Sequence, residues 1–339
     1  MDTAQLEQMV AYAFPGSTSS PELISTHISW VILTDQFAYK IKKPVHFSFL
    51  DFSTLERRRH FCQQELELNR RLAPDIYLDL QEIRHTPAGP RIGAPQGELI
   101  DYAVRMKRID SSKQMNLMLE EDAVTHDHLF AVARQIVRFH RERSPLRNVI
   151  DLNNWRHTFN DLEAIQRIVN EWGMSDTADL IARGLQFSDR FLARHGQRLL
   201  DRESEGWVIE GHGDLHAKNI FLTDPPVVFD CIEFSKELRQ LDVLNEIAFF
   251  CMDMDAFGQE ALGRVFLQAY LEQIPCMPKA EDRLIFDYFK LYRANVRLKV
   301  NGLRGKQASS PEDIRQWKAQ VRTYSVLFHD YLTKMERVF

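Results

Sequence analysis

The hydrophobic pattern of this sequence changes its period once, near Ile109, and this change limits the folds that the chain can adopt. Before it, short runs of β-branched and aromatic residues alternate with turn signals, which is typical of antiparallel strands. After it, apolar residues recur every three or four positions, which is typical of amphipathic helices. We therefore predict an α+β protein with a small antiparallel β part at residues 1–108 and a larger, mainly helical part at residues 109–339.

The β-rich part also contains one helix with clear ends. Ser53 or Thr54 can cap its start, and Pro74 follows its last turn. The predicted order is a helix at 1–14, a turn-rich break at 15–21, three strands within 22–45, a helix within 53–74, and strands at 76–85 and 98–109 around a Gly- and Pro-rich hairpin at 86–97.

The second part returns to strand character only around residues 206–234. Short apolar pieces separated by turns there predict strands at 207–210, 219–222 and 227–230. Helical periodicity predicts helices at 127–143, 158–172, 177–200, 244–258, 261–274, 283–304 and 314–335.

Charge and cysteine usage exclude several classes of protein. The net charge of −5 and the pI near 6.2 lack the basic signature of a dedicated nucleic-acid binder. The four cysteines are scattered, with no CxxC pair, so neither a disulfide framework nor a zinc knuckle is indicated. The first residues lack the pattern of a signal peptide, and no apolar run approaches the roughly 20 residues that cross a bilayer. We expect a cytoplasmic protein without a membrane partner.

The stretch HGDLHAKN, residues 212–219, concentrates polar side chains that suit two kinds of chemistry. His212, Asp214 and His216 alternate, so on a strand they would share one face and could hold zinc or iron. A metal-dependent hydrolase needs further ligand clusters, which the rest of the sequence does not supply. A polar turn with a structural histidine is the simplest alternative.

The spacing of Asp214 and Asn219 favours phosphoryl transfer. In the signature H-x-D-x-x-x-x-N, the aspartate accepts the proton of the attacking hydroxyl, and the asparagine five residues later ligates Mg²⁺. Asp230 ends the predicted strand VVFD eleven residues after Asn219. A short hairpin would bring Asn219 and Asp230 to one metal ion.

Two further residues fit a nucleotide phosphate site. The strand FAYK places Ala38 and Lys40 on one face, as in the kinase pattern V-A-I-K. Lys42 points the same way and is the fallback, and both lysines could instead be solvated. A lysine of this kind needs a carboxylate from the next helix, and Glu65 is favoured over Glu67 because it borders the apolar face.

The segment that joins the two parts is a candidate for adenine recognition. In ELIDYAVRMKRID an apolar strand runs into a polar connector. Met106, Lys107 and Arg108 are the candidates there, through main-chain groups that leave no side-chain signature.

In this order, FAYK, the acid that follows it, HGDLHAKN and VVFD resemble the aminoglycoside phosphotransferase-like small-molecule kinases, relatives of choline and fructosamine kinases. More narrowly, SWVILTDQFAYKIKKPV, LDFSTLERRRHFC, LNRRLAPDIYL and YAVRMKRI look like the kinase-like N-terminal part of bacterial proteins that often carry an added P-loop ATPase domain. No G-x-x-x-x-G-K-[ST] motif occurs in this sequence, so we expect that domain to be missing.

The resemblance implies a bilobal protein-kinase-like fold that uses ATP and Mg²⁺. It implies that Asp214 is the catalytic base, that Asn219 and Asp230 bind Mg²⁺, that Lys40 contacts phosphates and that Glu65 orients Lys40. His216 either approaches the γ-phosphate or braces the loop.

Two departures from the kinase pattern are visible. No glycine-rich phosphate loop is present, and Thr26 and Ser29 of the sequence THIS stand in its place. After Asp230 the sequence continues with Cys231-Ile232-Glu233, so Glu233 is either a second metal ligand or a structural acid.

A basic stripe raises the question of the acceptor. Lys290, Arg293, Arg297 and Arg304 recur at helical spacing. Facing a cleft, they would suit an anionic acceptor; facing outward, they would be a solvated surface. The acids within 119–127 could instead attract a cation.

We predict an ATP- and Mg²⁺-dependent phosphotransferase that acts on a hydroxyl of a small molecule. The alternatives are a catalytically silent, kinase-like nucleotide-binding module and a protein kinase, the latter disfavoured because no A-P-E-like segment follows Asp230. We expect no nucleic-acid partner, and the oligomeric state stays open.

Overall fold

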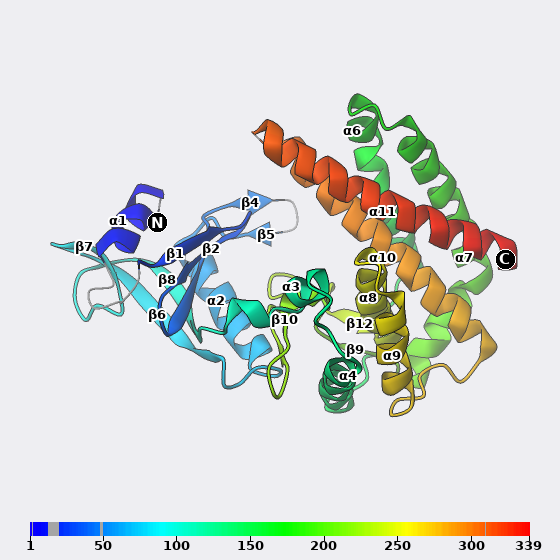
Figure 1. Cartoon of the computed structure of the whole chain (residues 1–339), viewed down its shortest axis with the longest axis horizontal. Helices are drawn as coiled ribbons and strands as arrows, with labels where there is room; N and C mark the ends of the chain where they lie inside the picture. Colours follow the sequence, from blue (N-terminus) through cyan, green and yellow to red (C-terminus); the bar gives the residue numbers. More distant parts are fainter. Residues whose placement is uncertain (2, 13–19, 48–49, 309) are drawn as a thin grey trace. The chain divides into compact units, whose positions relative to one another are not determined.

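The computed structural model describes residues 1, 3–12, 20–47, 50–308 and 310–339. It groups them into two compact units (Figure 1). Unit 1 contains Met1–Met118 and Lys218–Leu238, and unit 2 contains Leu119–Ala217 and Arg239–Phe339. The units differ from the predicted parts, because residues 109–118 and 218–238 belong with the β-rich unit. The lobe boundary at residue 108 stays a prediction.

Unit 1 is built around a six-stranded antiparallel sheet with the strand order β1-β2-β3-β8-β6-β7. The predicted strands are present, and β7 lies inside the segment that was predicted to be only a hairpin turn. The bounds are β1 Glu22–Ser25, β2 Ser29–Leu33, β3 Phe37–Lys42, β6 Tyr77–Thr86, β7 Gly89–Ile92 and β8 Glu98–Lys107. Two strands of two residues each, β4 His46–Phe47 and β5 Leu50–Asp51, are too short to show periodicity.

Alternation along the strands gives this sheet two apolar faces. On one face, Ala38 of β3 packs with helix α2 (Leu55–Asn69), which begins after the N-cap Thr54. On the other face, Ile41 packs with helix α1 (Thr3–Tyr12). Lys40 and Lys42 have the same parity as Ala38, so β3 carries both lysines on the side of α2.

The segment 218–238 joins unit 1 through a small hairpin. Strand β10 (Ile220–Phe221) pairs with β11 (Val227–Val228). The backbone N–H of Leu222 donates to the carbonyl of Lys113 at 2.8 Å, next to the short helices η1 (Ser111–Lys113) and α3 (Met115–Glu120). Val227 and Phe229 pack against the same apolar cluster as Ala38, so unit 1 needs this distant segment to complete its core.

Unit 2 is mainly helical, as predicted. Figure 1 shows its two last helices, α10 and α11, side by side, and they pack along one another. The helices are α4 His126–Arg141, α5 Leu152–Asn160, α6 Gln166–Glu171, α7 Ser175–Glu205, α8 Val243–Ala256, α9 Glu260–Leu271, α10 Ala280–Gln307 and α11 Pro311–Val338; strands β9 Val208–Glu210 and β12 Gln240–Asp242 pair antiparallel.

One helix prediction was wrong. Residues 158–172 do not form a single α-helix: α5 ends at Asn160, a 3₁₀ segment η2 covers Asp161–Ile165, and α6 follows. Phe159, Leu162, Ile165 and Ile168 are buried and lie three positions apart, which matches the three-residue turn of a 3₁₀-helix better than the α-helical period.

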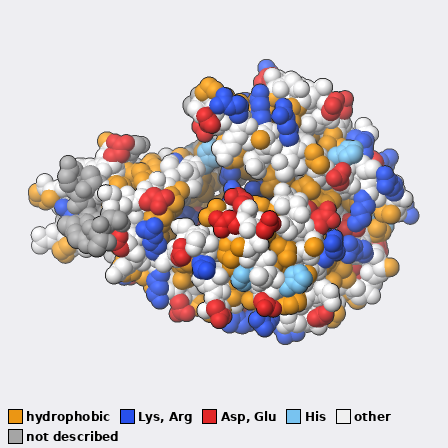
Figure 2. All heavy atoms as spheres, in the orientation of Figure 1, with side chains coloured by type: hydrophobic (Ala, Val, Ile, Leu, Met, Phe, Trp, Pro, Cys, Tyr) orange, Lys and Arg blue, Asp and Glu red, His pale blue; other side chains and the backbone are white. Residues whose placement is uncertain are grey.

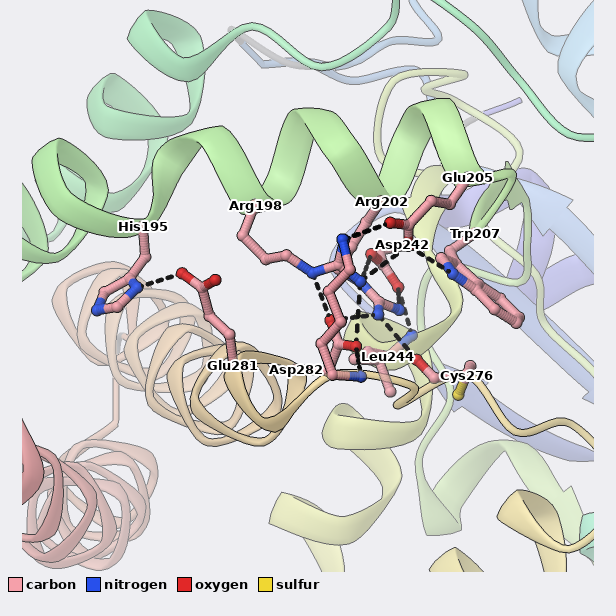
Figure 3. Close-up of polar contacts among 11 residues, drawn as sticks. His195, Arg198, Arg202, Glu205, Trp207, Asp242, Leu244, Cys276, Glu281 and Asp282 are labelled. Atoms are coloured by element: carbon pink, nitrogen blue, oxygen red, sulfur yellow. Dashed lines mark hydrogen bonds and ion pairs between the residues drawn. The ribbon is translucent and has the colours of Figure 1, made fainter.

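Buried ion pairs fix the start of α8 in unit 2 (Figure 3). Arg202 of α7 donates to both oxygens of Asp242, at 2.6 and 2.8 Å, and to Asp282 at 2.9 Å. Asp242 accepts the N–H of Leu244 at 2.8 Å and is the N-cap of α8. Because α8 is buried on nearly all sides, its polar residues point into the interior of the unit.

Across the part of the chain that the structure describes, no helix is both long and apolar enough to cross a bilayer.

Candidate functional site

The loop at residues 211–217 of unit 2 is held by two carboxylates of α8. One oxygen of Glu246 accepts the N–H groups of His212 and Gly213 at 2.8 and 2.6 Å. Asp253, two turns later on α8, accepts the N–H of Ala217 at 2.8 Å. Position 211 requires glycine, because a Cβ there would lie 2.5 Å from a Glu246 oxygen.

Glu246 is itself oriented by a chain of hydrogen bonds. Its second oxygen contacts Nε2 of His140 at 2.7 Å, and Nδ1 of His140 contacts the hydroxyl of Tyr270 at 2.7 Å. Burial would raise the pKa of Glu246, but the hydrogen bonds and positive charge around it lower that pKa to about 2. Glu246 therefore stays ionised. Sequence reasoning missed this network, although an acid within the apolar run VLNEIAFFCM was a signal.

Asp214 projects from this loop with its side chain 38% exposed. Nε2 of His216 lies 3.2 Å from Oδ2 of Asp214, and the His216 ring packs edge-on against Phe249. Burial would raise the pKa of Asp214, but His216, Arg297 and His212 together hold that pKa well below its usual range. The carboxylate is therefore ionised at neutral pH.

The structure does not support the alternative of a zinc or iron site here. Residues 212–216 do not form a strand, so the alternation of His212, Asp214 and His216 does not place them on one strand face. Nδ1 of His212 accepts the N–H of Asp214 at 3.2 Å, a contact within the loop. Among the described residues, no group of three or more His, Cys, Asp or Glu side chains could hold a metal ion.

A cluster of alternating charges lies beneath the sheet of unit 1. Nζ of Lys40 contacts Glu65 at 2.8 Å and Asp230 at 2.5 Å. Nζ of Lys42 contacts the other oxygen of Glu65 at 2.8 Å and also pairs with Glu233. The buried carboxylate of Glu65 on α2 thus forms ion pairs with both lysines of β3.

The charges of this cluster stabilise one another. Burial would lower the pKa of Lys40, but Asp230 and Glu65 raise it well above its usual value. Burial would raise the pKa of Glu65, but Lys40 and Lys42 lower it to about 2. Neither lysine is a solvated strand end, and Glu67, the disfavoured acid, is exposed. Glu233 is paired with Lys42, which favours a structural acid over a second metal ligand.

Asn219 and Asp230 are brought together by the β10–β11 hairpin of unit 1. The N–H of Phe229 donates to the carbonyl of Asn219 at 3.0 Å. Asp230 has a positive φ of 61° and a side chain 41% exposed, with Oδ1 on Lys40. Hydrogen bonds fix this backbone on both sides, since the N–H of Asp230 donates to Tyr77 and that of Cys231 to Asn69. The hairpin thus places the backbone of buried Asn219 opposite Phe229, the residue before Asp230.

The candidates for the phosphate loop differ in their surroundings. The hydroxyl of Thr26 donates to the carbonyl of Ser29 and accepts its N–H, both at 3.0 Å, so it closes a turn. The hydroxyl of Ser29 is buried and has no hydrogen-bond partner among the described residues. Ser29 lies opposite Lys42 in the ladder, on the lysine side of the sheet.

Burial and backbone hydrogen bonds limit the groups that the three adenine candidates can offer to a nucleobase. Met106 is buried in the core of unit 1. The N–H groups of Lys107 and Arg108 already donate to Ile76 and Gln36, both at 2.9 Å. A nucleobase at Lys107 or Arg108 would therefore have to use their carbonyl groups, and the prediction for this segment remains open.

The basic stripe of α10 is not a solvated surface, because none of its four residues is exposed. Lys290 pairs with Asp255. Arg293 donates to the carbonyl of Gly213 at 3.1 Å and to Asn245 at 2.6 Å, and it lies over the ring of Phe249. One member of the stripe therefore holds the backbone next to Asp214.

Comparison with known proteins gives the family. The model of the "Phosphotransferase enzyme family" matches residues 52–282, more than half of the chain. The chain belongs to this family. Membership confirms the family predicted from the motifs.

Three uncharacterized mycobacterial proteins, from Mycobacterium bovis and two strains of Mycobacterium tuberculosis, are 31% identical to the chain over 303 residues. The match covers 86% of this chain and 57% of each relative. The chain thus spans little more than half the length of these relatives.

Solved structures with the same fold include three kinases of the expected kind. Choline kinase from Cryptosporidium parvum has a TM-score of 0.56 at 14% identity, covering 99% of this chain and 96% of that one. A choline/ethanolamine kinase family protein from Mesorhizobium loti has a TM-score of 0.52 at 11% identity, covering 98% and 97%. The GDP complex of aminoglycoside 2′-phosphotransferase-IIIa has a TM-score of 0.53 at 13% identity, covering 96% and 99%. The predicted protein-kinase-like fold is confirmed.

Proposed function

We propose that this chain transfers the terminal phosphoryl group of ATP to a hydroxyl group of a small molecule. The observation that carries the proposal is the position of Lys40 between buried Glu65 and half-exposed Asp230. Glu65 fixes an ammonium group that is suited to phosphate oxygens, and Asp230 offers a carboxylate beside it. A GDP complex of a protein with the same fold supports the use of a nucleotide.

The residues of the β10–β11 hairpin fit Mg²⁺. Asn219 and Asp230 supply an amide and a carboxylate oxygen, the hard oxygen donors that Mg²⁺ prefers. Within the described residues, only Oδ1 of Asp230 is engaged by a protein side chain, so Oδ2 is open to a cation. A bound Mg²⁺ would supply charge neutralisation on the phosphates.

In the proposed reaction, Asp214 accepts the proton of the acceptor hydroxyl. The hydroxyl oxygen forms a bond to the γ-phosphorus as the bond between that phosphorus and its bridging oxygen breaks, and ADP leaves. His216 braces Asp214, and the low pKa of Asp214 keeps its carboxylate ready to accept the proton. Lys40 stabilises negative charge on the phosphates.

Nucleotide binding is tested first, by thermal shift with ATP or GTP in the presence and absence of Mg²⁺. We expect stabilisation by ATP that depends on Mg²⁺. No stabilisation by either nucleotide would contradict the proposal.

Turnover is tested next, by following ADP release with a pool of small metabolites. ADP release with the pool and none with Asp214→Asn supports the kinase. Stabilisation without turnover on any acceptor would instead indicate a silent nucleotide-binding module, and labelling of the protein itself or of added proteins would indicate a protein kinase.

A further inference from the structure

Two guanidinium groups of α10 lack carboxylate partners such as those of Lys290 and Arg202 in the same unit. Lys290 has Asp255, and Arg202 has Asp242 and Asp282. No carboxylate oxygen of a described residue lies within 4.0 Å of Arg297 or Arg304. Arg297 donates to the hydroxyl of Tyr324 at 3.2 Å, and Arg304 lies over the ring of Trp317.

Burial opposes the positive charges of these two arginines. Both side chains are partly buried among helices, where burial opposes the charged form. At Arg297, Tyr324, Asp253 and Asp214 outweigh this effect and raise the pKa. At Arg304, burial and the neighbouring charge of Arg297 lower the pKa, and they outweigh the opposing effect of Asp214. A bound anion would offset this effect of burial.

The two arginines lie on the same side of unit 2 as the proposed base. Arg293 contacts the carbonyl of Gly213, the residue before Asp214. Arg297 follows one turn later on α10 and Arg304 two turns after that, rises of about 6 and 10 Å. Both arginines also interact electrostatically with Asp214. Along α10 from the base, Arg297 and Arg304 therefore follow as cations with no carboxylate oxygen of a described residue within 4.0 Å.

We propose that Arg297 and Arg304 bind an anionic group of the acceptor, a carboxylate or a phosphate, while its hydroxyl lies at Asp214. This inference rests on the proposed phosphotransferase function. Guanidinium groups match both anions because they donate pairs of parallel N–H bonds. The rise along α10 favours an acceptor in which several bonds separate the hydroxyl from the anionic group, such as a sugar phosphate or a sugar acid.

The first half of α11 carries more basic than acidic side chains: three cations follow Glu312 and Asp313 of its first turn. Figure 2 shows Lys and Arg side chains gathered over the first half of α11, where Arg315, Lys318 and Arg322 lie. A basic surface raises the local concentration of anions and repels polycations. The proposed acceptor therefore differs in charge from aminoglycosides and choline.

The test compares acceptors of different charge. Glucose 6-phosphate and ribose 5-phosphate represent phosphates, gluconate represents carboxylates, glucose is the neutral control, and kanamycin and choline are cations. We expect ADP release with members of the anionic set, and the phosphate and carboxylate arms show which anion is used. ADP release with only neutral or cationic compounds would overturn the inference while leaving the proposed kinase intact.

Substitutions of the two arginines test whether they cause the preference for anionic acceptors. We expect Arg297→Gln and Arg304→Gln to raise the KM for the anionic acceptor about ten- to hundredfold. Arg264→Gln, an exposed side chain on α9, is the matched control and should change little. An unchanged KM in both variants would contradict the inference.

Folding and nucleotide binding are monitored separately. Each variant should keep the wild-type thermal shift with Mg²⁺ and ATP, and Arg297→Lys should restore part of the affinity because it keeps the charge. Loss of the nucleotide shift in the wild type would refute the proposed function. Nucleotide binding with no discrimination by charge would refute only the anionic acceptor.

Discussion

At the scale of single residues, Glu65 and Glu246 show that a buried carboxylate can organise a site without touching a substrate. Glu65 holds two lysines of one strand, and Glu246 holds two backbone N–H groups of one loop. Both are kept ionised by partners that outweigh the cost of burial. Changing such a residue alters the position of its partners rather than the chemistry itself.

The two lysines of β3 should respond differently to replacement by methionine. Lys42→Met leaves Glu233 buried without a partner and should destabilise unit 1 by about 3–5 kcal/mol. Lys40→Met leaves Glu65 paired with Lys42 and Asp230 half-exposed, so we expect a loss of only about 1 kcal/mol. Urea unfolding measures both changes.

The same two substitutions show which of the two lysines binds the phosphates. Lys40→Met should abolish stabilisation by ATP, because the ammonium proposed to bind phosphate is gone. If Lys40→Met keeps the nucleotide shift and a folded Lys42→Met loses it, Lys42 is the phosphate ligand and the assignment is reversed.

Glu246 predicts a specific pH dependence of stability. Its folded pKa of about 2 lies below the ordinary value of 4.5, so its contribution is present above about pH 4.5 and is lost as pH falls toward 2. The contribution amounts to about 3 kcal/mol. We expect wild type to be more stable than Glu246→Gln at pH 6, with a difference that shrinks between pH 4.5 and 2, as measured by urea unfolding. A difference that stays constant over this range would exclude titration of Glu246 as its source.

At the scale of elements, α8 and α10 hold the Asp214 loop from two directions. Helix α8 supplies Glu246 and Asp253 to its N–H groups, and α10 supplies Arg293 to a carbonyl. The ion pairs of Figure 3 fix the first turn of α8 against α7 and α10. The position of Asp214 therefore depends on the packing of long helices, and close helix contacts in unit 2 should matter for activity.

Glycines on α7 offer a test of such packing. A Cβ at Gly184 would lie 2.4 Å from the ring of Phe328, which is fully buried on α11. We expect Gly184→Ala to destabilise unit 2 by about 1–3 kcal/mol. Gly196→Ala is the matched control, because its Cβ would meet only the mobile end of Leu152 at 2.9 Å and alanine favours a helix by about 1 kcal/mol. Equal thermal shifts for the two variants would show that the contact with α11 is not tight.

The elements also show which contacts a single sequence can reveal. The spacing of Ala38, Lys40 and Glu65 along one strand and the next helix predicted the Lys40–Glu65 ion pair, which is present. Glu246 lies more than 100 positions from His140, so no local spacing links them. The pairing of Glu233 with Lys42, 191 positions apart, depends equally on tertiary structure and could not be chosen over metal binding from the sequence.

At the scale of the whole molecule, the period of the hydrophobic pattern predicted the α+β class and most helices, because that signal is local and repeated. The extent of unit 1 could not be predicted in this way. Residues 218–238 belong to it because Val227 and Phe229 complete its core and Glu233 neutralises Lys42. These contacts join segments that are far apart in the chain.

This division predicts the behaviour of fragments. Residues 1–118 alone should fold poorly, because they lack part of the apolar cluster and the partner of Lys42. A chain that joins Met118 to Lys218 through a short linker and ends at Leu238 should fold better, since Leu222 and Lys113 are already hydrogen-bonded. The dispersion of amide signals in NMR spectra compares the two. Good dispersion for residues 1–118 alone would show that the second segment is dispensable.

The boundary between Ala217 and Lys218 falls inside HGDLHAKN, so a single motif serves both units. Each unit is therefore encoded by two separate gene segments. Exchanging one contiguous segment between two related genes cannot replace a whole unit and keep the other, because residues 218–238 of unit 1 lie between the two segments of unit 2. Recombination between such genes would tend to transmit both units as a block, and new acceptor preferences would arise by substitution along helices such as α10 rather than by shuffling.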